Sequence, residues 1–470
     1  MSLLIPGTNS IKDTGYNVSN SLRFDDASND WLSKTFSSSG NRQKQTISVW
    51  IKRCNLAASS SIFSVYYTGS IYANFYFNGS DQLQYFNNGG SINLTTTRLF
   101  RDNSSWYHIL LKLDTTDSTA DDRIKMYVNG VQETSFAART NPGLNAEVTF
   151  GDNYAHYIGT YNNGASDDFD GYMSQFVFTT NVAYGPDSFG ETDSDSGIWI
   201  PKEIDGLTFN TNAFFLDFED SSTLGNDVSG NNNDFTANNL TAIDQSTDTC
   251  TNNFATLNPL YHYIGGAALS EGNLKFTTSG NSSVGRGMST IRPESGKWYV
   301  ECKIIDVTRF SFGLMNGNET NSSQGGENTN SVIFDYVGGF YMAGGFSGYL
   351  SAPSNNDIVQ LALDLDNDLF WIGINDTWGN SATRTEIENG TATNDATTFI
   401  SSQVPINTGA IGIFVEDNSS TGNNVAEINF GNPTFSISSG NADANGYGNF
   451  EYAVPSGYYA LCTKNLAEFG

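Results

Sequence analysis

The sequence predicts an all-β protein, and three observations support this fold class. Tyr and Phe supply 23 and 32 of the 470 residues, Gly supplies 47, and only 15% of residues are charged. Aromatic side chains fit a half-buried pleated surface, and small turn residues allow tight corners between strands. No long segment carries apolar residues at helical spacing, which argues against a helical bundle. The third observation is a hairpin pattern that occurs twice, in residues 110–132 and 360–376.

This repeated pattern consists of two alternating segments around a polar turn. Leu111-Lys-Leu-Asp114 in the first copy returns as Leu361-Ala-Leu-Asp364 in the second. Alternation with a period of two predicts strands with one core-facing side. The second segments end in Asn129-Gly130 and Asn375-Asp376, pairs that tolerate the positive φ of tight hairpin turns. Two β domains with the same central hairpin would explain the repeat.

The domain organisation follows from length and from one segment of different composition. A chain of 470 residues is too long for one ordinary core, and both halves contain short strands with turn residues between them. Residues 219–253 are poor in apolar side chains and show no periodicity. We therefore expect a docking arm at 1–20, a first sandwich at 21–218, an extended linker at 219–262 and a second sandwich at 263–470.

The charge pattern and the hydropathy exclude two classes of partner. The formal net charge is −28, and no stretch gathers basic residues into a stripe, so the phosphate backbone of a nucleic acid would be repelled. No apolar run approaches the ~18 residues of a membrane span. The N-terminal sequence lacks the basic region of a signal peptide. We expect a protein made in a cytoplasm, without nucleic acid binding or membrane insertion.

Several segments resemble known domains of the concanavalin A-like jelly-roll class. SLRFDDASNDWLSKTFSSSGNRQKQTISVWIKR, RDNSSWYHILLKLDTT, MYVNGVQ and FDGYMSQFVF resemble a laminin-G-like domain over about residues 21–218. GKWYVECKI, DIVQLALDLDNDLFWIGIND and GYYALCTKNL resemble a SPRY domain over about residues 290–466. The resemblance implies two concanavalin A-like jelly-roll sandwiches in tandem. That tandem, with its joining sequence SGIWIPKEIDG, is similar to structural proteins of tailed bacteriophages, particularly those of marine hosts.

The resemblance implies a virion structural protein, expected as a tail fibre or a receptor-binding appendage located in the virion. Its partners would be other virion proteins of tail, baseplate or capsid, and a host cell-surface glycan or protein met by the loops at the sandwich rim. A homo-oligomer is expected, with a trimer favoured. Two alternatives stay open. The chain could be a capsid or tail decoration protein without receptor binding, or an enzyme that degrades polysaccharide.

The enzyme alternative has little support in the sequence. Laminarinase-type enzymes of this class carry Glu-x-Asp-x-x-Glu on one strand, which places nucleophile and acid/base at the spacing of a retaining glycosidase. The nearest pattern here is Glu203-Ile-Asp205-Gly-Leu-Thr208, with Thr208 at the acid/base position. Only three His residues are present, which leaves little material for a hydrolase triad. We expect no catalytic residues and no enzymatic activity.

Binding residues are predicted in two aromatic, amide-rich regions. Glycan binding needs flat rings beside amide and carboxylate groups, because sugars combine weakly polar C–H faces with hydroxyl edges. The loop 151–171 supplies one such set, and a second surface is expected at the end of the second sandwich. The predicted contact residues are Tyr154, Tyr157, Tyr161, Asn162, Asp168, Tyr341, Tyr349 and Trp378.

A calcium site is the one cofactor prediction, and no other cofactor is required. Laminin-G-like domains often hold Ca²⁺ at the sandwich rim with hard oxygen ligands. The candidate ligands are Asp152, Asp167, Asp168 and Asp170. The rival interpretation is an acidic loop tip that binds nothing tightly.

Overall fold

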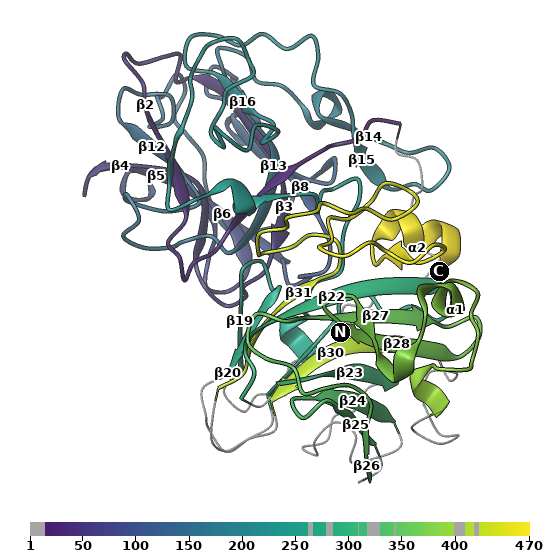
Figure 1. The fold of residues 1–470 in the computed structure, drawn as a ribbon. Helices are drawn as coiled ribbons and strands as arrows, with labels where there is room; N and C mark the ends of the chain where they lie inside the picture. The colour runs from purple at the N-terminus through teal and green to yellow at the C-terminus, as the bar shows by residue number, and fades with distance from the viewer. Residues whose placement is uncertain are drawn as a thin grey trace. The chain divides into compact units, whose positions relative to one another are not determined.

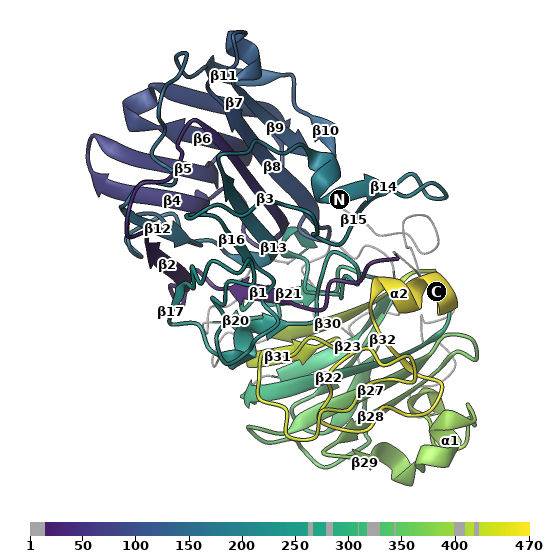
Figure 2. The same cartoon turned by 90° about the horizontal axis from the view of Figure 1, so that it is seen from above.

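The computed structural model describes residues 15–261, 267–278, 285–308, 310–316, 330–342, 345–398, 409–417 and 423–470. These residues divide into two compact units, which we call the first sandwich (15–251) and the second sandwich (from Asn252 onward). Figures 1 and 2 show that strands dominate both units. The prediction of an all-β fold is confirmed. The α-helices of the described residues are short, α1 (Arg384–Glu388) and α2 (Thr463–Phe469), and neither could span a membrane.

The first sandwich consists of two antiparallel sheets, each eight-stranded in the described residues. Sheet 1 has, in spatial order, β10 (Val131–Gln132), β9 (Ile124–Val128), β8 (Tyr107–Asp114), β3 (Lys44–Arg53), β13 (Gly171–Thr180), β1 (Ser21–Phe24) and β18 (Gln245–Ser246), with β16 (Phe214–Leu216) also paired to β13. Sheet 2 has β11 (Phe136–Thr140), β7 (Ile92–Leu99), β6 (Gln82–Asn87), β5 (Ile71–Phe77), β4 (Ser60–Thr68), β12 (Ala155–Ile158), β2 (Trp31–Thr35) and β17 (Thr236–Asn238). A hairpin of β14 (Gly190–Thr192) and β15 (Trp199–Pro201) is separate from both sheets.

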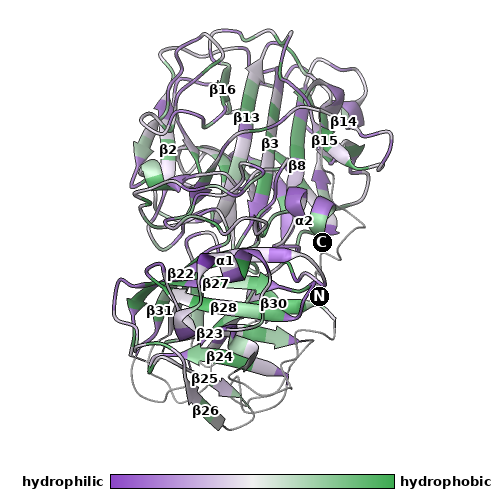
Figure 3. Cartoon of the chain, turned by 45° about the vertical axis from the view of Figure 1, so that its right-hand side comes forward, coloured by the Kyte–Doolittle hydropathy of each residue, from purple (hydrophilic) through white to green (hydrophobic). Residues whose placement is uncertain are grey.

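The core of the first sandwich lies between sheets 1 and 2. Phe63 of β4 is fully buried, and its ring centroid lies 4.7 Å from that of Phe150 and 5.4 Å from that of Phe178. Complete burial of one such ring contributes on the order of 1.5–3 kcal/mol. Figure 3 shows hydrophobic positions along β3, β8 and β13, with hydrophilic positions frequent in the loops. The alternation that predicted strands therefore has a physical cause, since every second side chain enters this core.

The second sandwich is also built from two sheets of the described residues. Sheet 3 has β19 (Ala267–Ser270), β20 (Lys275–Thr278), β31 (Val425–Asn429), β22 (Lys297–Asp306), β27 (Ile358–Asp364), β28 (Leu369–Ile374) and β29 (Thr377–Trp378), with β32 (Tyr459–Ala460) parallel to β22. Sheet 4 has β21 (Gly285–Met288), β30 (Ile411–Asp417), β23 (Phe310–Asn316), β24 (Ser331–Asp335), β25 (Gly339–Met342) and β26 (Gly345–Gly348). The tandem arrangement of two sandwiches agrees with the predicted fold class.

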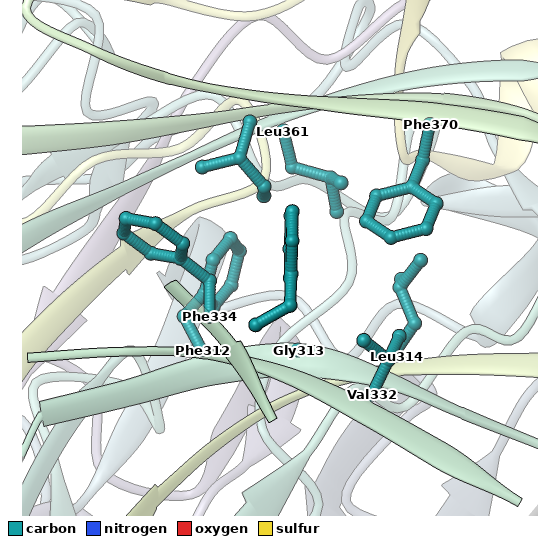
Figure 4. A pocket seen from close by; sticks show the side chains of 9 residues that line it. Phe312, Gly313, Leu314, Val332, Phe334, Leu361 and Phe370 are labelled. Atoms are coloured by element: carbon teal, nitrogen blue, oxygen red, sulfur yellow. The ribbon is translucent and has the colours of Figure 1, made fainter. Parts of the chain in front are cut away.

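A small cavity between sheets 3 and 4 is part of the core. It measures about 10 Å³ and is lined by apolar side chains, among them Phe312 and Phe334 from one sheet and Leu361 and Phe370 from the other. Figure 4 shows these side chains pointing toward one another across the sandwich. A space of this size holds at most one water, and it offers no polar side chain to bind one. The cavity is an imperfection of packing and no ligand site.

The two predicted hairpins form as β8–β9 and β27–β28, in equivalent surroundings. In each copy the Asp that ends the first strand lies opposite a Lys on the neighbouring strand. Lys44 Nζ lies 3.0 Å from Asp114 Oδ2, and Lys297 Nζ lies 2.9 Å from Asp364 Oδ2. Each Asp also accepts a backbone N–H from the turn that follows. The repeated Leu-x-Leu-Asp motif therefore encodes a strand, its end and an ion pair to the next strand.

The prediction of an extended linker at 219–262 is wrong. Within this segment β17 extends sheet 2 through β2, and β18 extends sheet 1 through β1. The division between the units falls at residues 251 and 252, so the end of the segment belongs to the second sandwich. Low apolar content misled the prediction because only a few apolar side chains, Leu224 and Phe235 among them, enter the core, while backbone hydrogen bonds and buried polar groups attach the rest of the segment.

The N-terminal arm predicted at 1–20 is described only from residue 15 onward. There, Val18 is 7% exposed and its backbone N–H donates to Thr251 Oγ1 at 3.1 Å. Gln175 Nε2 donates to the Tyr16 hydroxyl at 3.0 Å. These residues lie on the first sandwich, while residues 1–14 lie outside the described chain.

A fully buried ion pair anchors the end of the 219–251 segment. Lys52 Nζ on β3 lies 2.7 Å from Asp248 Oδ2, and both side chains are 0% exposed. Trp106 Nε1 donates to the other carboxylate oxygen of Asp248 at 3.0 Å. Removing one partner of a buried pair leaves an uncompensated charge in a low-dielectric interior, which costs about 3–5 kcal/mol.

Asp248→Ala should therefore lower the free energy of unfolding of the first sandwich by about 3–5 kcal/mol. Urea unfolding followed by tryptophan fluorescence would measure the loss. Asp205→Ala, at an exposed loop carboxylate, is the matched control and should change stability little. Equal stabilities of the two variants would mean that residues 219–251 are not integral to the sandwich.

Histidine burial gives the first sandwich a stability that depends on pH. His108 on β8 is 0% exposed, lies 2.8 Å from Ser48 Oγ, and accepts a hydrogen bond from Trp199 Nε1 at 3.1 Å. Burial lowers the pKa of His108 to about 3, and mainly burial lowers that of His156 to about 4. In the unfolded chain both pKa values return to about 6.5. Below that pH the unfolded state binds more protons, so stability falls as the pH drops from 6.5 toward 4.

His108→Gln should weaken this pH dependence, since it removes one of the two buried imidazoles. Each contributes at most about 1.4 kcal/mol per pH unit in this window. Urea unfolding of wild type and variant at pH 7 and pH 5 would give the two slopes. An unchanged slope in the variant would contradict a neutral, buried His108.

Candidate functional site

The outward side of sheet 2 carries polar and aromatic side chains in place of apolar ones. On β5, Phe75 and Phe77 enter the core, while Tyr72, Asn74 and Tyr76 point to the opposite side. The strand register places matching outward residues beside them on β4, β6 and β7. Figure 2 shows β7, β6, β5, β4 and β12 side by side, so these residues share one continuous surface. We call it the tyrosine face, formed by Tyr66, Tyr72, Tyr76, Gln84, Phe86, Asn93 and the loop residue Tyr161.

Four rings of the tyrosine face contact one another. Tyr72 stacks on Phe86 with 5.7 Å between centroids, and Tyr66 lies 6.4 Å from Tyr72. Tyr161 meets Tyr66 edge to face at 5.5 Å and Tyr72 at 6.5 Å. All four side chains are half-buried. Neighbouring rings hold each other in place, and part of their surface stays accessible.

A row of hydrogen-bonded polar side chains, two of them amides, crosses three strands beside these rings. The Tyr76 hydroxyl donates to Gln84 Oε1 at 2.9 Å, and Gln84 Nε2 donates to Asn93 Oδ1 at 3.0 Å. Thr95 Oγ1 donates to the same Asn93 oxygen at 3.1 Å. These bonds fix the orientation of both amides, so their remaining hydrogen-bonding capacity points in set directions.

Tyr161 reaches the tyrosine face from a loop that is hydrogen-bonded to β4. Ser64 Oγ donates to the backbone oxygen of Thr160 at 2.7 Å, and the Ser61 N–H donates to that of Asp167 at 2.7 Å. The loop turns sharply at Asn162 and Asn163, which have φ of 58° and 60°, values that Asn tolerates better than most residues. The loop is therefore a formed structure that positions Tyr161.

Three tyrosine hydroxyls of the tyrosine face differ from that of Tyr76, which is hydrogen-bonded to Gln84. Within the described chain, the hydroxyls of Tyr66, Tyr72 and Tyr161 make no side-chain hydrogen bond. Burial raises the pKa of Tyr161, with smaller contributions from Tyr72, Tyr66 and Asp167, so its hydroxyl stays protonated at neutral pH. Each such hydroxyl can donate one hydrogen bond and accept others.

The five binding residues predicted in the first sandwich have different surroundings in the structure. Tyr161 joins the tyrosine face, and Asn162 lies half-buried at the turn beside it. Tyr157 is only 7% exposed and packs edge to face on Trp31 at 5.6 Å. Tyr154 stacks on Tyr67, which is 59% exposed, at 4.3 Å. Asp168 accepts a hydrogen bond from Thr160 Oγ1.

The second predicted surface does not form as expected. Tyr349 is 7% exposed, its ring packs 4.8 Å from that of Phe340, and its hydroxyl donates to the Asn394 backbone oxygen at 3.3 Å. Trp378 is 8% exposed and belongs to a buried cluster on the outward side of sheet 3. Tyr341 is half-buried against a separate cluster on sheet 4. Neither Tyr349 nor Trp378 can offer a ring face to a sugar, and the loop 317–329 lies outside the described residues.

The four predicted calcium ligands do not come together. Asp152 forms an ion pair with Arg42. Asp170 is 6% exposed, and its backbone oxygen accepts the Cys54 N–H. Asp167 and Asp168 lie half-buried in the loop of Tyr161. Among the described residues, no three acidic, His or Cys side chains are grouped so that they could hold a metal ion.

The glycosidase-like sequence 203–208 lies far from the tyrosine face. Glu203, Asp205 and Thr208 are exposed on a loop whose Ile204 and Leu207 pack against the outward side of sheet 1. The tyrosine face is on the outward side of the opposite sheet. Glu203 and Asp205 lie two positions apart on this one loop, and Thr208, which has no carboxyl group, stands at the acid/base position.

The binding residues predicted for the first sandwich all came from one loop region, so the prediction missed most of the tyrosine face. Tyr66, Tyr72, Tyr76, Gln84, Phe86 and Asn93 lie on strands. A signal was present, because Tyr72, Asn74 and Tyr76 occupy alternate positions on one strand, and Gln82 and Gln84 do so on the next. Tyrosine and amide residues on the solvent side of several consecutive strands predict a functional surface.

Comparison with known protein families gives a match to part of the first sandwich. Residues 26–182 match the family described as the Concanavalin A-like lectin/glucanases superfamily. This range lies within the predicted domain 21–218 and includes every residue of the tyrosine face. The first sandwich therefore contains a concanavalin A-like domain. A search of curated proteins gives no match.

Solved structures that are similar to parts of this chain include the following three, all of low sequence identity. The SPRY domain of human HERC1 is 12% identical, with 37% of this chain and 96% of that chain covered and a TM-score of 0.29. Stonustoxin is 17% identical, with 37% and 27% covered and a TM-score of 0.26. A protein named as a candidate carbohydrate binder from Bacteroides ovatus is 18% identical, with 47% and 59% covered and a TM-score of 0.32. With TM-scores this low, these likenesses say nothing further about this chain.

Proposed function

We propose that the protein binds glycans through the tyrosine face of its first sandwich. The observation that carries the proposal is the group of Tyr66, Tyr72 and Tyr161, whose half-buried rings keep their hydroxyls available beside an ordered row of amides. Aromatic rings accept the C–H face of a pyranose, while amides and hydroxyls bind its hydroxyl edges. Both kinds of contact are present on one surface.

The proposed activity is adhesion, and catalysis is not part of it. Hydrolysis by a retaining or inverting enzyme needs two carboxyl groups on opposite sides of the scissile bond. The carboxylates nearest to the tyrosine face, Asp167 and Asp168, are neighbours in one loop, and Asp168 is held by Thr160. A shallow surface of this kind binds each sugar weakly. Several copies in one assembly would raise the total affinity through avidity.

For the biological setting, we propose a virion appendage of a tailed bacteriophage, such as a tail fibre, that contacts host surface glycan. The support is the tandem order of the two domain resemblances and the sequence that joins them. A homotrimer attached to other virion proteins would supply the several copies that weak sites need.

Truncation of two rings should abolish glycan adhesion without unfolding the protein. A glycan array probed with the purified full chain would first identify a bound sugar. Tyr66→Ala combined with Tyr161→Ala should then weaken its binding at least tenfold, which corresponds to about 1.4 kcal/mol. Isothermal titration calorimetry would measure the change, and circular dichroism would check the fold.

Leu144→Ala is the matched control, because Leu144 is 56% exposed on a loop outside the tyrosine face. Its glycan affinity should equal that of wild type. Wild-type affinity in the folded double variant would refute the proposed site, and silence on a broad array would refute glycan binding itself.

A further inference from the structure

The tyrosine face is formed without any basic side chain. The outward positions of β2, β4, β5, β6, β7 and β12 hold Trp, Tyr, Phe, Leu, Ser, Thr, Asn, Gln and Ala. The basic side chains of these strands and of β11 contact other residues or lie on the opposite side of the sheet. Arg98 pairs with Glu133 at 3.2 Å, and Arg139 stacks on Phe136 and pairs with Asp121 at 3.5 Å. Lys34 lies on the opposite side of β2, since it neighbours His156 in the register.

Acidic groups lie at the border of the same surface. The backbone of Asp167 is bonded to Ser61, which lies opposite Tyr76 in the register of β4 and β5. Asp167 also follows Ser166, which is paired with Tyr161. Burial, and then repulsion from Asp168, raise the pKa of Asp167. Within the described residues, neither Asp167 nor Asp168 forms an ion pair with a basic side chain. The field at the tyrosine face is therefore negative or neutral, in a chain whose net charge is −28.

We infer that the tyrosine face selects uncharged glycans and excludes those that carry sulfate or uronate groups. The inference rests on the proposed function, because it names the class of glycan bound at that site. An anionic sugar brought to this surface would lose water without gaining a cation or a charge-assisted hydrogen bond. It would also approach the carboxylates of Asp167 and Asp168, and like charges repel most strongly where solvent is partly excluded.

Matched polymers that differ only in charge would test the inference. Affinity electrophoresis of the full chain against dextran and dextran sulfate, and against xylan and glucuronoxylan, should show retardation by a neutral member. The charged member of that pair should bind at least tenfold more weakly at low ionic strength, where electrostatic effects are largest. Tyr161→Ala should remove the retardation by the neutral polymer.

A variant that adds a positive charge to the tyrosine face also tests whether the missing basic side chains cause the exclusion of anionic glycans. Thr140 of β11 is exposed and lies beside Asn93 in the register, on the outward side of sheet 2. Thr140→Lys should increase binding of the sulfated or uronate-bearing polymer severalfold, and added salt should reverse the gain. Gln132→Lys, at an exposed position of sheet 1, adds the same charge away from the tyrosine face and should produce no gain.

The outcomes separate the inference from the proposed function. Stronger binding of the anionic polymer, lost in Tyr161→Ala, would overturn charge selection and leave glycan binding in place. Equal gains in Thr140→Lys and Gln132→Lys would also overturn it, since the charge on the face would not be the cause. If neither pair of polymers nor a broad glycan array shows binding, the proposed function fails and the inference fails with it.

Discussion

Burial of one side of each sheet against its partner is the constraint on which the first sandwich depends. Side chains such as Phe63 and Phe75 must enter the space between sheets 1 and 2, which fixes the pairing register of every strand. The same register then decides which residues are left on the outside. Tyr66, Tyr72 and Gln84 form a surface because their neighbours in sequence are required for the core.

The strands of this fold could be predicted from the sequence because their signal is local. Alternation around Leu111 and Leu361 identified both central hairpins correctly. The segment 219–251 was misjudged because its attachment is not local. Its buried pair joins residues 196 positions apart, Lys52 and Asp248, and a single sequence contains no trace of that contact. Such polar attachments become visible only when the strands are placed in space.

The candidate site shows the same limit at the level of single residues. Tyr161 was predicted because its loop combines aromatic rings with amide and carboxylate groups. Tyr349 and Trp378 were predicted for a second surface of the same kind, yet both are buried, Tyr349 in the core of the second sandwich and Trp378 in a cluster on the outward side of sheet 3. A Tyr or Trp side chain combines an apolar ring with one polar group, so it can lie in a core or on a surface. Its position in the sequence alone does not decide between the two. The strand residues of the tyrosine face required knowledge of which side of sheet 2 is covered.

The short strand β17 covers the edge of β2 in sheet 2. It occupies the edge of sheet 2 beside β2, where unpaired backbone groups would otherwise form a template for another chain. A recombinant fragment that stops at residue 218 would lack β17 and would therefore expose the backbone of β2 from Trp31 to Ser33. Fragments of the first sandwich intended to remain monomeric and resist aggregation should therefore extend to residue 251.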